Sequence, residues 1–402
     1  MAKRAAKSDN STSSPDPAPA KSSATTPAKS STPAKTPKSA KDKDKDSKDK
    51  DAAAGAGAGA TPTAGTTKPR RQTKPRVSSA AAGGSGSGSG ADKHGGALLA
   101  GLHPVVKVAA VEVLALGLIT AGHVAVATMS HNEMGGLKAL GQTTEELVWQ
   151  VGWRALELAI AWFANLDCVD VAMMSFIAHA PSFWLLGMFY GVRPATVVSS
   201  LAVDVLSPAI PFYLARPLAN VHLSSTAKLY NKDLISLPYQ ALIAALAASV
   251  YSTVLVLALR FLLPRVFVVY FRGMPTLEPA YAASLPALLP VALCFGAASS
   301  VLVFAPYVTT GKSKDDDKVR QFDPVQATLR ETVWWNFCGY TARTRVILER
   351  TLVAVLVTGV STYLTCTASI DGVGCVGAFV YAGVWAVAAA ATGASLALVG
   401  RE

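Results

Sequence analysis

The chain has 402 residues, of which 51% are hydrophobic and only 16% are charged. Soluble domains usually carry about 25% charged residues, so this composition excludes an ordinary soluble enzyme, and five cysteines are too few for a disulfide-rich secreted module. The positive charge is concentrated in residues 1–96, which hold 18 Lys and Arg against 8 acids, whereas the rest of the chain is nearly neutral.

Residues 1–96 contain no Leu, Ile, Phe, Trp or Tyr and show no hydrophobic periodicity. Such a segment buries too little apolar surface to offset the entropy of ordering its backbone, so we expect a disordered, basic, low-complexity tail. No apolar stretch follows Lys3 and Arg4, which argues against a secretory signal at this end.

The densest positive charge in the tail is the run KPRRQTKPR at residues 68–76. Three interpretations of this run remain open. It is a solvated linker, a patch that binds anionic lipid at about 1 kcal/mol per cation, or a nuclear-targeting or nucleic-acid contact, which we favour least. The cations of this basic patch are Lys68, Arg70, Arg71, Lys74 and Arg76.

The composition becomes strongly apolar after Gly96. A helix needs about 20 mainly apolar residues to cross the hydrocarbon core of a bilayer, and eight segments come close to that length or exceed it. The sequence therefore predicts that residues 97–402 form an all-α bundle of about eight transmembrane helices. The predicted spans are residues 105–128, 148–166, 171–190, 195–215, 237–263, 280–307, 346–366 and 375–399.

The second predicted span is the weakest because it contains Arg154 and Glu157. It could lie along the interface as an amphipathic helix, which would leave seven spans. The distribution of positive charge favours eight spans, because the loop at 308–345 carries seven Lys and Arg and cytosolic loops collect these residues. We therefore expect an integral protein of an intracellular membrane, with both termini in the cytosol.

Several ionisable residues lie inside the predicted spans, where a charge is costly and normally faces the bundle interior. Arg154 and Glu157 are three residues apart and can pair on one helix surface, and His123 lies about three turns beyond Glu112. These groups either neutralise one another to fix helix pairing or form a relay for protons or a solute. The relay candidates are Asp204, Glu112, His179, Arg154 and Glu157.

Two predicted spans contain pairs of prolines, which remove backbone donors and can break a helix. Pro208 and Pro211 follow Asp204, and Pro286 and Pro290 lie in the span at 280–307. Helices interrupted in this way mark the binding sites of some transporters. However, the two spans do not occupy matching places in two halves of the chain, and we find no internal repeat.

Other chemical motifs are few. Cys366 and Cys375 bracket a short loop on the predicted outer side, where a disulfide is one option and two small apolar helix residues are the other. The sequence contains no CxxC, HExxH, Walker or GxSxG motif. We therefore expect no metal, no cofactor and no enzymatic activity.

The loop at 308–345 contains a predicted short helix, for which Asp323 is a candidate N-cap and Pro324 the first residue. The stretch from Phe322-Asp323-Pro324 through Trp335-Asn336 and Gly339-Tyr340 to Arg345, with the spans after it, resembles a family of uncharacterised multi-pass membrane proteins of filamentous fungi. The resemblance covers about the last third of the chain. It implies a eukaryotic membrane and no particular activity.

The sequence leaves two functions open. The first is a non-enzymatic organising or tethering protein, whose helical body sits in the lipid bilayer while its basic tail recruits anionic lipid or a cytosolic protein. The alternative is a secondary transporter or channel for a small solute, with the intramembrane acids and His179 as a relay. The oligomeric state and the substrate do not follow from the sequence.

Overall fold

The computed structural model describes residues 101, 103–137, 144–223 and 231–400. The tail predicted for residues 1–96, with its basic patch, lies outside the described residues. The described chain is helical and contains no β-strand, apart from one isolated bridge between Phe271 and Val373. The predicted all-α bundle is therefore confirmed.

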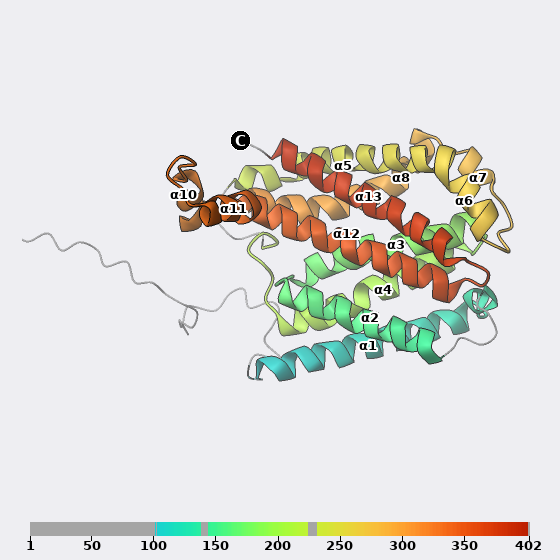
Figure 1. Cartoon of the computed structure of the whole chain (residues 1–402). Coiled ribbons are helices and arrows are strands. Elements are labelled where there is room, and N and C mark those ends of the chain that lie inside the picture. Colours follow the sequence, from blue (N-terminus) through green and yellow to red (C-terminus); the bar gives the residue numbers. More distant parts are fainter. Residues whose placement is uncertain (1–100, 102, 138–143, 224–230, 401–402) are drawn as a thin grey trace, which may run out of the picture. The chain divides into compact units, whose positions relative to one another are not determined.

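The long helices run side by side and make up a single bundle (Figure 1). η3 and η4 are π-helical turns inside longer helices, whereas η1 and η2 are short 3-10 helices in the connections. In chain order the elements are α1 (Pro104–Met129), η1 (Glu133–Leu137), α2 (Thr144–Phe163), α3 (Cys168–Phe189), α4 (Pro194–Ala215), η2 (Lys232–Ile235), α5 (Leu237–Leu257), η3 (Ala258–Leu262), α6 (Leu263–Tyr270), α7 (Glu278–Tyr281), α8 (Leu285–Ser299), η4 (Ser300–Phe304), α9 (Ala305–Thr309), α10 (Lys314–Arg320), α11 (Leu329–Cys338), α12 (Ala342–Ser369) and α13 (Cys375–Val399).

Seven helices of the described chain are long and apolar enough to cross a membrane. They are α1, α3, α4, the continuous run from α5 to α6, the run from α8 to α9, α12 and α13. α2 corresponds to the second predicted span and is less apolar because of its charges. It nevertheless packs against α1 and α12 and lies beside α1 within the bundle (Figure 1).

α3 lies at the centre of the bundle and α1 at its edge. Inside the bundle, 72% of the most apolar stretch of α3 is buried, against 11% of that of α1. α1 instead exposes apolar side chains such as Val113, which suits contact with lipid. Around α3 the core is rich in aromatic rings, with Trp184 packed edge-on against Phe189 and Trp385.

Two prolines are accommodated by π-helical turns rather than by helix ends. Pro264 and Pro306 each follow a five-residue π-helical turn, with one residue between. A proline has no N–H for the carbonyl four residues earlier and its ring crowds that carbonyl, and a wider turn relieves both problems. The fifth predicted span, expected to end at residue 263, therefore continues to Tyr270.

The four prolines that the sequence suggested as helix breaks do not break their helices, so this prediction is wrong. α4 continues through Pro208 and Pro211, and α8 continues through Pro290. Pro286 stands in the first turn of α8, where its missing N–H has no helical partner to lose. For Pro208, Pro211 and Pro290, the lost backbone hydrogen bonds can be compensated by groups of neighbouring helices in the packed bundle.

The predicted start of the short helix before α12 is also wrong. Asp323 accepts a hydrogen bond from the backbone N–H of Val325 (2.9 Å) and shapes a turn instead. α11 begins at Leu329, after a capping box in which Thr328 and Glu331 satisfy each other's backbone N–H groups. The Thr-x-x-Glu pattern is the stronger N-terminal signal, because it supplies two acceptors to the free N–H groups.

Candidate functional site

Four of the five relay candidates converge with one further histidine in the interior of the bundle. They come from four different helices: His123 from α1, Arg154 and Glu157 from α2, His179 from α3 and Asp204 from α4. We call these five residues the charged cluster. The side chains of Glu157, His179 and Asp204 are almost fully buried, whereas that of His123 is 37% exposed.

Asp204 holds the first half of the charged cluster together. Its Oδ1 accepts a hydrogen bond from Nη2 of Arg154 over 2.6 Å and lies 3.0 Å from Nε2 of His123. The guanidinium thus compensates the negative charge of a carboxylate that is almost fully buried. The contact of His123 with Asp204 connects α1 to α4. A buried pair of this kind is costly to disrupt, because the partner left behind is an uncompensated charge.

His179 joins the second half of the charged cluster through a single atom. Its Nε2 lies 3.2 Å from Oε1 of Glu157 and also contacts Nη1 of Arg154. That nitrogen can donate to Glu157 only when it carries a proton, and it can accept from Arg154 only when it carries none. The position of one proton therefore selects the partner of His179.

Arg154 and Glu157 are 3.6 Å apart, as their spacing on one helix predicts. Glu112, by contrast, takes part in no hydrogen bond or ion pair described for this chain and lies outside the charged cluster. Eleven residues separate it from His123, which is about 16 Å along a helix. No contact described for this chain therefore joins Glu112 to the other relay candidates.

A cavity of about 370 Å³ adjoins the charged cluster. Its wall is mostly apolar and comes from α1, α2, α3, α4, α12 and the residues around η1. His123, Arg154, His179 and Asp204 line it, together with the aromatic side chains of Trp153 and Phe183. The indole N–H of Trp153 donates to Ser361 of α12 over 2.8 Å, which fixes that part of the wall.

A second ionic cluster, which the sequence did not suggest, lies where α3 begins. It consists of Asp167, Asp170, His222 and Arg350. Asp167 caps α3 by accepting from the backbone N–H of Asp170 (2.8 Å), and its other oxygen lies 2.6 Å from Nδ1 of His222. Arg350 of α12 binds both oxygens of Asp170, at 2.8 and 2.9 Å.

The hydrogen bond between His222 and Asp167 changes the pKa of both groups. Burial lowers the pKa of His222, but the bond to Asp167 and the negative charges of Asp167 and Asp170 outweigh burial and raise it above its usual value. Burial likewise raises the pKa of Asp167, and hydrogen bonds from His222 and two backbone N–H groups outweigh burial and lower it. Both shifts favour a charged pair.

The second ionic cluster offers three ligand atoms, from Asp167, Asp170 and His222, within 4.8 Å of one another. A divalent cation could in principle use them. However, Arg350 already occupies both oxygens of Asp170, and its positive charge opposes a cation at this position.

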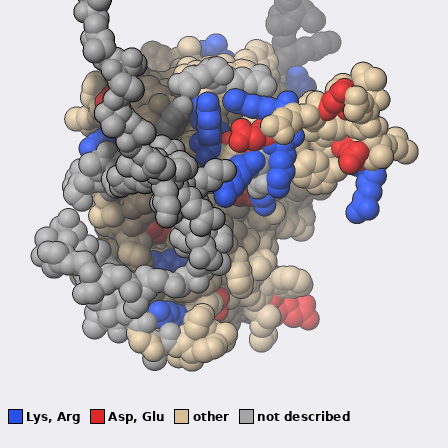
Figure 2. All heavy atoms as spheres, turned by 90° about the vertical axis from the view of Figure 1, so that its left-hand side faces the viewer, with Lys and Arg blue, Asp and Glu red and all other residues tan. Residues whose placement is uncertain are grey.

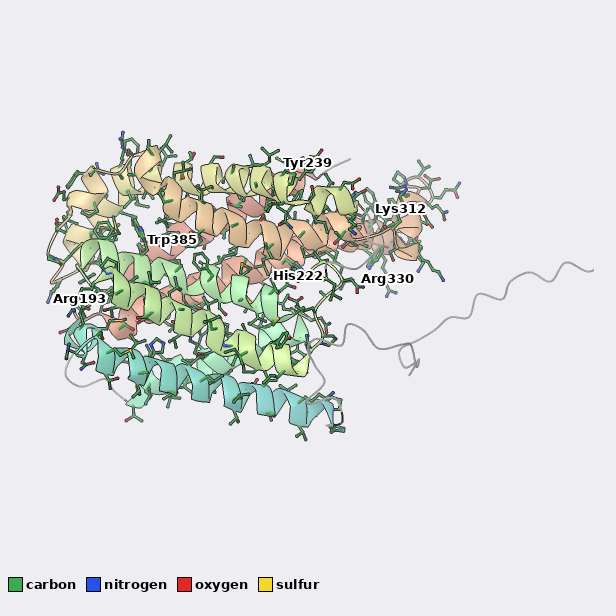
Figure 3. The ribbon with its side chains drawn as sticks, turned by 180° about the vertical axis from the view of Figure 1, so that it is seen from behind. Arg193, His222, Tyr239, Lys312, Arg330 and Trp385 are labelled. Carbon is green, nitrogen blue, oxygen red and sulfur yellow. The ribbon has the colours of Figure 1, made fainter. Side chains whose placement is uncertain are left out.

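In Figure 3, His222 lies toward the end of the bundle that carries Lys312 and Arg330, and Arg193 lies at the opposite end.

Cys366 and Cys375, for which the sequence left a disulfide open, are both free thiols. α12 extends to Ser369, so Cys366 is buried within the helix rather than placed at the loop. Cys375 is exposed at the first position of α13. The two side chains therefore belong to helices, as small apolar residues often do.

No protein-family model matches the chain, and neither a curated protein nor a solved structure matches it.

Proposed function

We propose that this chain is a proton-coupled membrane carrier for a small solute, in which the charged cluster is the relay. The observation that carries the proposal is the double contact of His179, whose Nε2 faces both Glu157 and Arg154 beside a cavity. Ionisable side chains inside a membrane bundle are costly and mark ion or substrate pathways. Neither a carrier nor a tether catalyses a chemical reaction, so we propose a role without enzymatic activity.

A proton on His179 would change what Arg154 can do. Without the proton, Nε2 accepts from Arg154, and the guanidinium bridges His179 and Asp204. With the proton, Nε2 donates to Glu157 and repels Arg154, which frees part of the guanidinium for another partner. Uptake and release of one proton thus alter the polar wall of the cavity, which is what coupling requires.

The gathering of positive charge at one end of the bundle supports an orientation for the carrier. Figure 2 shows Lys and Arg side chains grouped on this end. The segment at this end that contains α10 and α11, residues 312–345, carries six exposed cations. They are Lys312, Lys314, Lys318, Arg320, Arg330 and Arg345. Because cytosolic loops collect Lys and Arg, we infer that this end faces the cytosol.

Transport can be tested in liposomes containing the full-length protein. The uptake of labelled tetraethylammonium, glutamate and glucose would be measured under an imposed pH gradient, against protein-free liposomes. We expect gradient-driven uptake of at least one solute and its loss in Asp204→Asn, with Asp323→Asn as the matched control outside the bundle. Uptake of none of the three, or unchanged uptake in Asp204→Asn, would contradict the proposal.

The tethering role remains a second candidate, which the positive charge on the same end of the bundle favours. It depends mainly on residues 1–96, outside the described residues. Deleting them should abolish binding to liposomes with anionic lipid, or to a cytosolic partner, while membrane insertion persists. If binding is unchanged, the tail does not tether.

A further inference from the structure

We infer that the cavity beside the charged cluster binds a monovalent organic cation, namely a protonated amine carried on an apolar body. The inference rests on the proposed function only for its biological role. The binding itself follows from the charge balance of the cavity, from its wall and from an unused carboxylate oxygen.

The first step is the charge balance of the groups that face one another. α1 contributes His123, α2 contributes Arg154 and Glu157, α3 contributes His179 and α4 contributes Asp204, whereas the cavity-lining residues of α12 are not ionisable. With both imidazoles neutral, two carboxylates face one guanidinium. This leaves one negative charge unbalanced on two carboxylates that are almost fully buried. Such a charge is unfavourable unless a cation or a proton compensates it.

The second step is the acceptor available to a ligand. Among the described residues, both polar contacts of Asp204 use Oδ1, so Oδ2 can accept a hydrogen bond from an ammonium N–H. Oε2 of Glu157 lies 3.6 Å from Nη1 of Arg154 and is buried without a hydrogen-bond partner in the described chain. The two carboxylates therefore lie inside the bundle and not on its exposed surface.

The third step is the wall of the cavity. Trp153 and Phe183 line it among aliphatic side chains, and aromatic faces attract organic cations. A volume of about 370 Å³ lies near the lower end of the range for small-molecule sites, roughly 300–1,000 Å³. An apolar body bearing one ammonium group matches both the wall and the carboxylate, whereas an anion would add to the unbalanced charge.

Protons should compete with this ligand. Protonation of His123 or His179 brings the net charge of the charged cluster to zero without a ligand, because Arg154 already offsets one of the two carboxylates. The site therefore exchanges one proton for one organic cation. If this site belongs to the proposed carrier, the solute is a monovalent organic cation that is exchanged for one proton.

Three probes of similar shape test the charge preference: benzylammonium, benzyl alcohol and benzoate. Their binding to the full-length protein in detergent would be measured by isothermal titration calorimetry at pH 8. We expect benzylammonium to bind at least about tenfold more tightly than benzyl alcohol, and benzoate not to bind detectably. Lowering the pH should weaken the preference, because a proton taken up by any member of the charged cluster removes the unbalanced negative charge.

Two variants locate the binding. Asp204→Asn and Glu157→Gln each remove one negative charge, so each should abolish the preference for benzylammonium, and either suffices if the other fails to fold. Asp323→Asn, on the loop before α11, should retain it. Equal or tighter binding of benzoate, or a preference that survives the loss of either carboxylate, would overturn the inference. Selective binding without solute uptake would refute the carrier and leave the binding site standing.

Discussion

Arg350 donates a hydrogen bond of 2.7 Å to the backbone carbonyl of Leu302, a residue of the π-helical turn η4. Pro306 stands four residues after Leu302 and has no N–H, so it cannot supply the helical donor for that carbonyl. The same guanidinium binds Asp170 at the start of α3. One side chain of α12 thus supplies a hydrogen-bond donor to η4 and also binds the first turn of α3.

Hydroxyl groups of α12 likewise approach backbone carbonyls of α3. Pro181 leaves the carbonyl of Ile177 without its helical donor, and the hydroxyl of Thr358 lies 3.5 Å from that oxygen. The hydroxyl of Thr362 approaches the carbonyl of Ala178 at the same distance. Polar side chains of α12 therefore approach backbone carbonyls of neighbouring helices. Two of these carbonyls, those of Ile177 and Leu302, lack a helical donor because a proline stands four residues later, and such contacts are how these defects are tolerated in a membrane bundle.

Replacing Arg350 by Lys should destabilise the protein by about 3 kcal/mol. Lysine cannot reproduce the forked contact with Asp170 and reach the carbonyl of Leu302 at once. Thermal unfolding in detergent would measure the loss. Arg345→Lys is the matched control, because its pair with Glu349 is exposed and should change stability by less than about 1 kcal/mol. Equal effects of the two substitutions would show that the buried contacts of Arg350 do not stabilise the fold.

The sequence predicted the elements better than the contacts between them. Hydropathy located the long helices, and the spacing of Arg154 and Glu157 predicted their pairing, because both are local properties. The convergence of His179 and Asp204 on Arg154 depends on which faces of three helices meet, and no local pattern encodes this. The second ionic cluster was missed for the same reason: Asp167 and His222 are 55 residues apart in the chain.

The pair of His222 and Asp167 should make stability depend on pH. The pKa of His222 is raised on folding, so its contribution is complete below about pH 6.5 and is lost as the pH rises through the raised value. The pKa of Asp167 is lowered, so its contribution is present above about pH 4 and is lost on acidification. The unfolding temperature in detergent should therefore fall between pH 6 and pH 8.5.

The variant His222→Gln provides the comparison for that prediction. Glutamine does not titrate, so the variant should be less stable at pH 6 and should show a smaller decline toward pH 8.5 than the unmodified protein. If both proteins lose the same stability over this range, another group is responsible for the pH dependence.

Gly296 lies where α8 crosses α5 too closely for any side chain. A methyl group at this position would overlap the backbone carbonyl of Ala244. Gly296→Ala should therefore cost about 2 kcal/mol or more in unfolding free energy, because two packed backbones must separate. Gly117→Ala on α1 is the control, since nothing lies within 4 Å of the added methyl group. It should leave stability unchanged or raise it by up to about 1 kcal/mol. A loss in the control equal to that in Gly296→Ala would contradict this explanation.

Two neutral substitutions separate the relay seen in the geometry from the one that the sequence suggested. Glu112 lies outside the charged cluster, so Glu112→Gln should leave the pH profile of gradient-driven solute uptake unchanged. His179→Gln removes the group whose proton selects between Glu157 and Arg154. We expect uptake by this variant to depend less on pH, because glutamine cannot take up the proton that His179 would carry. The flattened profile matters more than the rate, because a merely structural histidine would lower uptake equally at every pH. A normal profile in His179→Gln would exclude His179 as the proton carrier, and a flattened one in Glu112→Gln would show that Glu112 takes part in the relay.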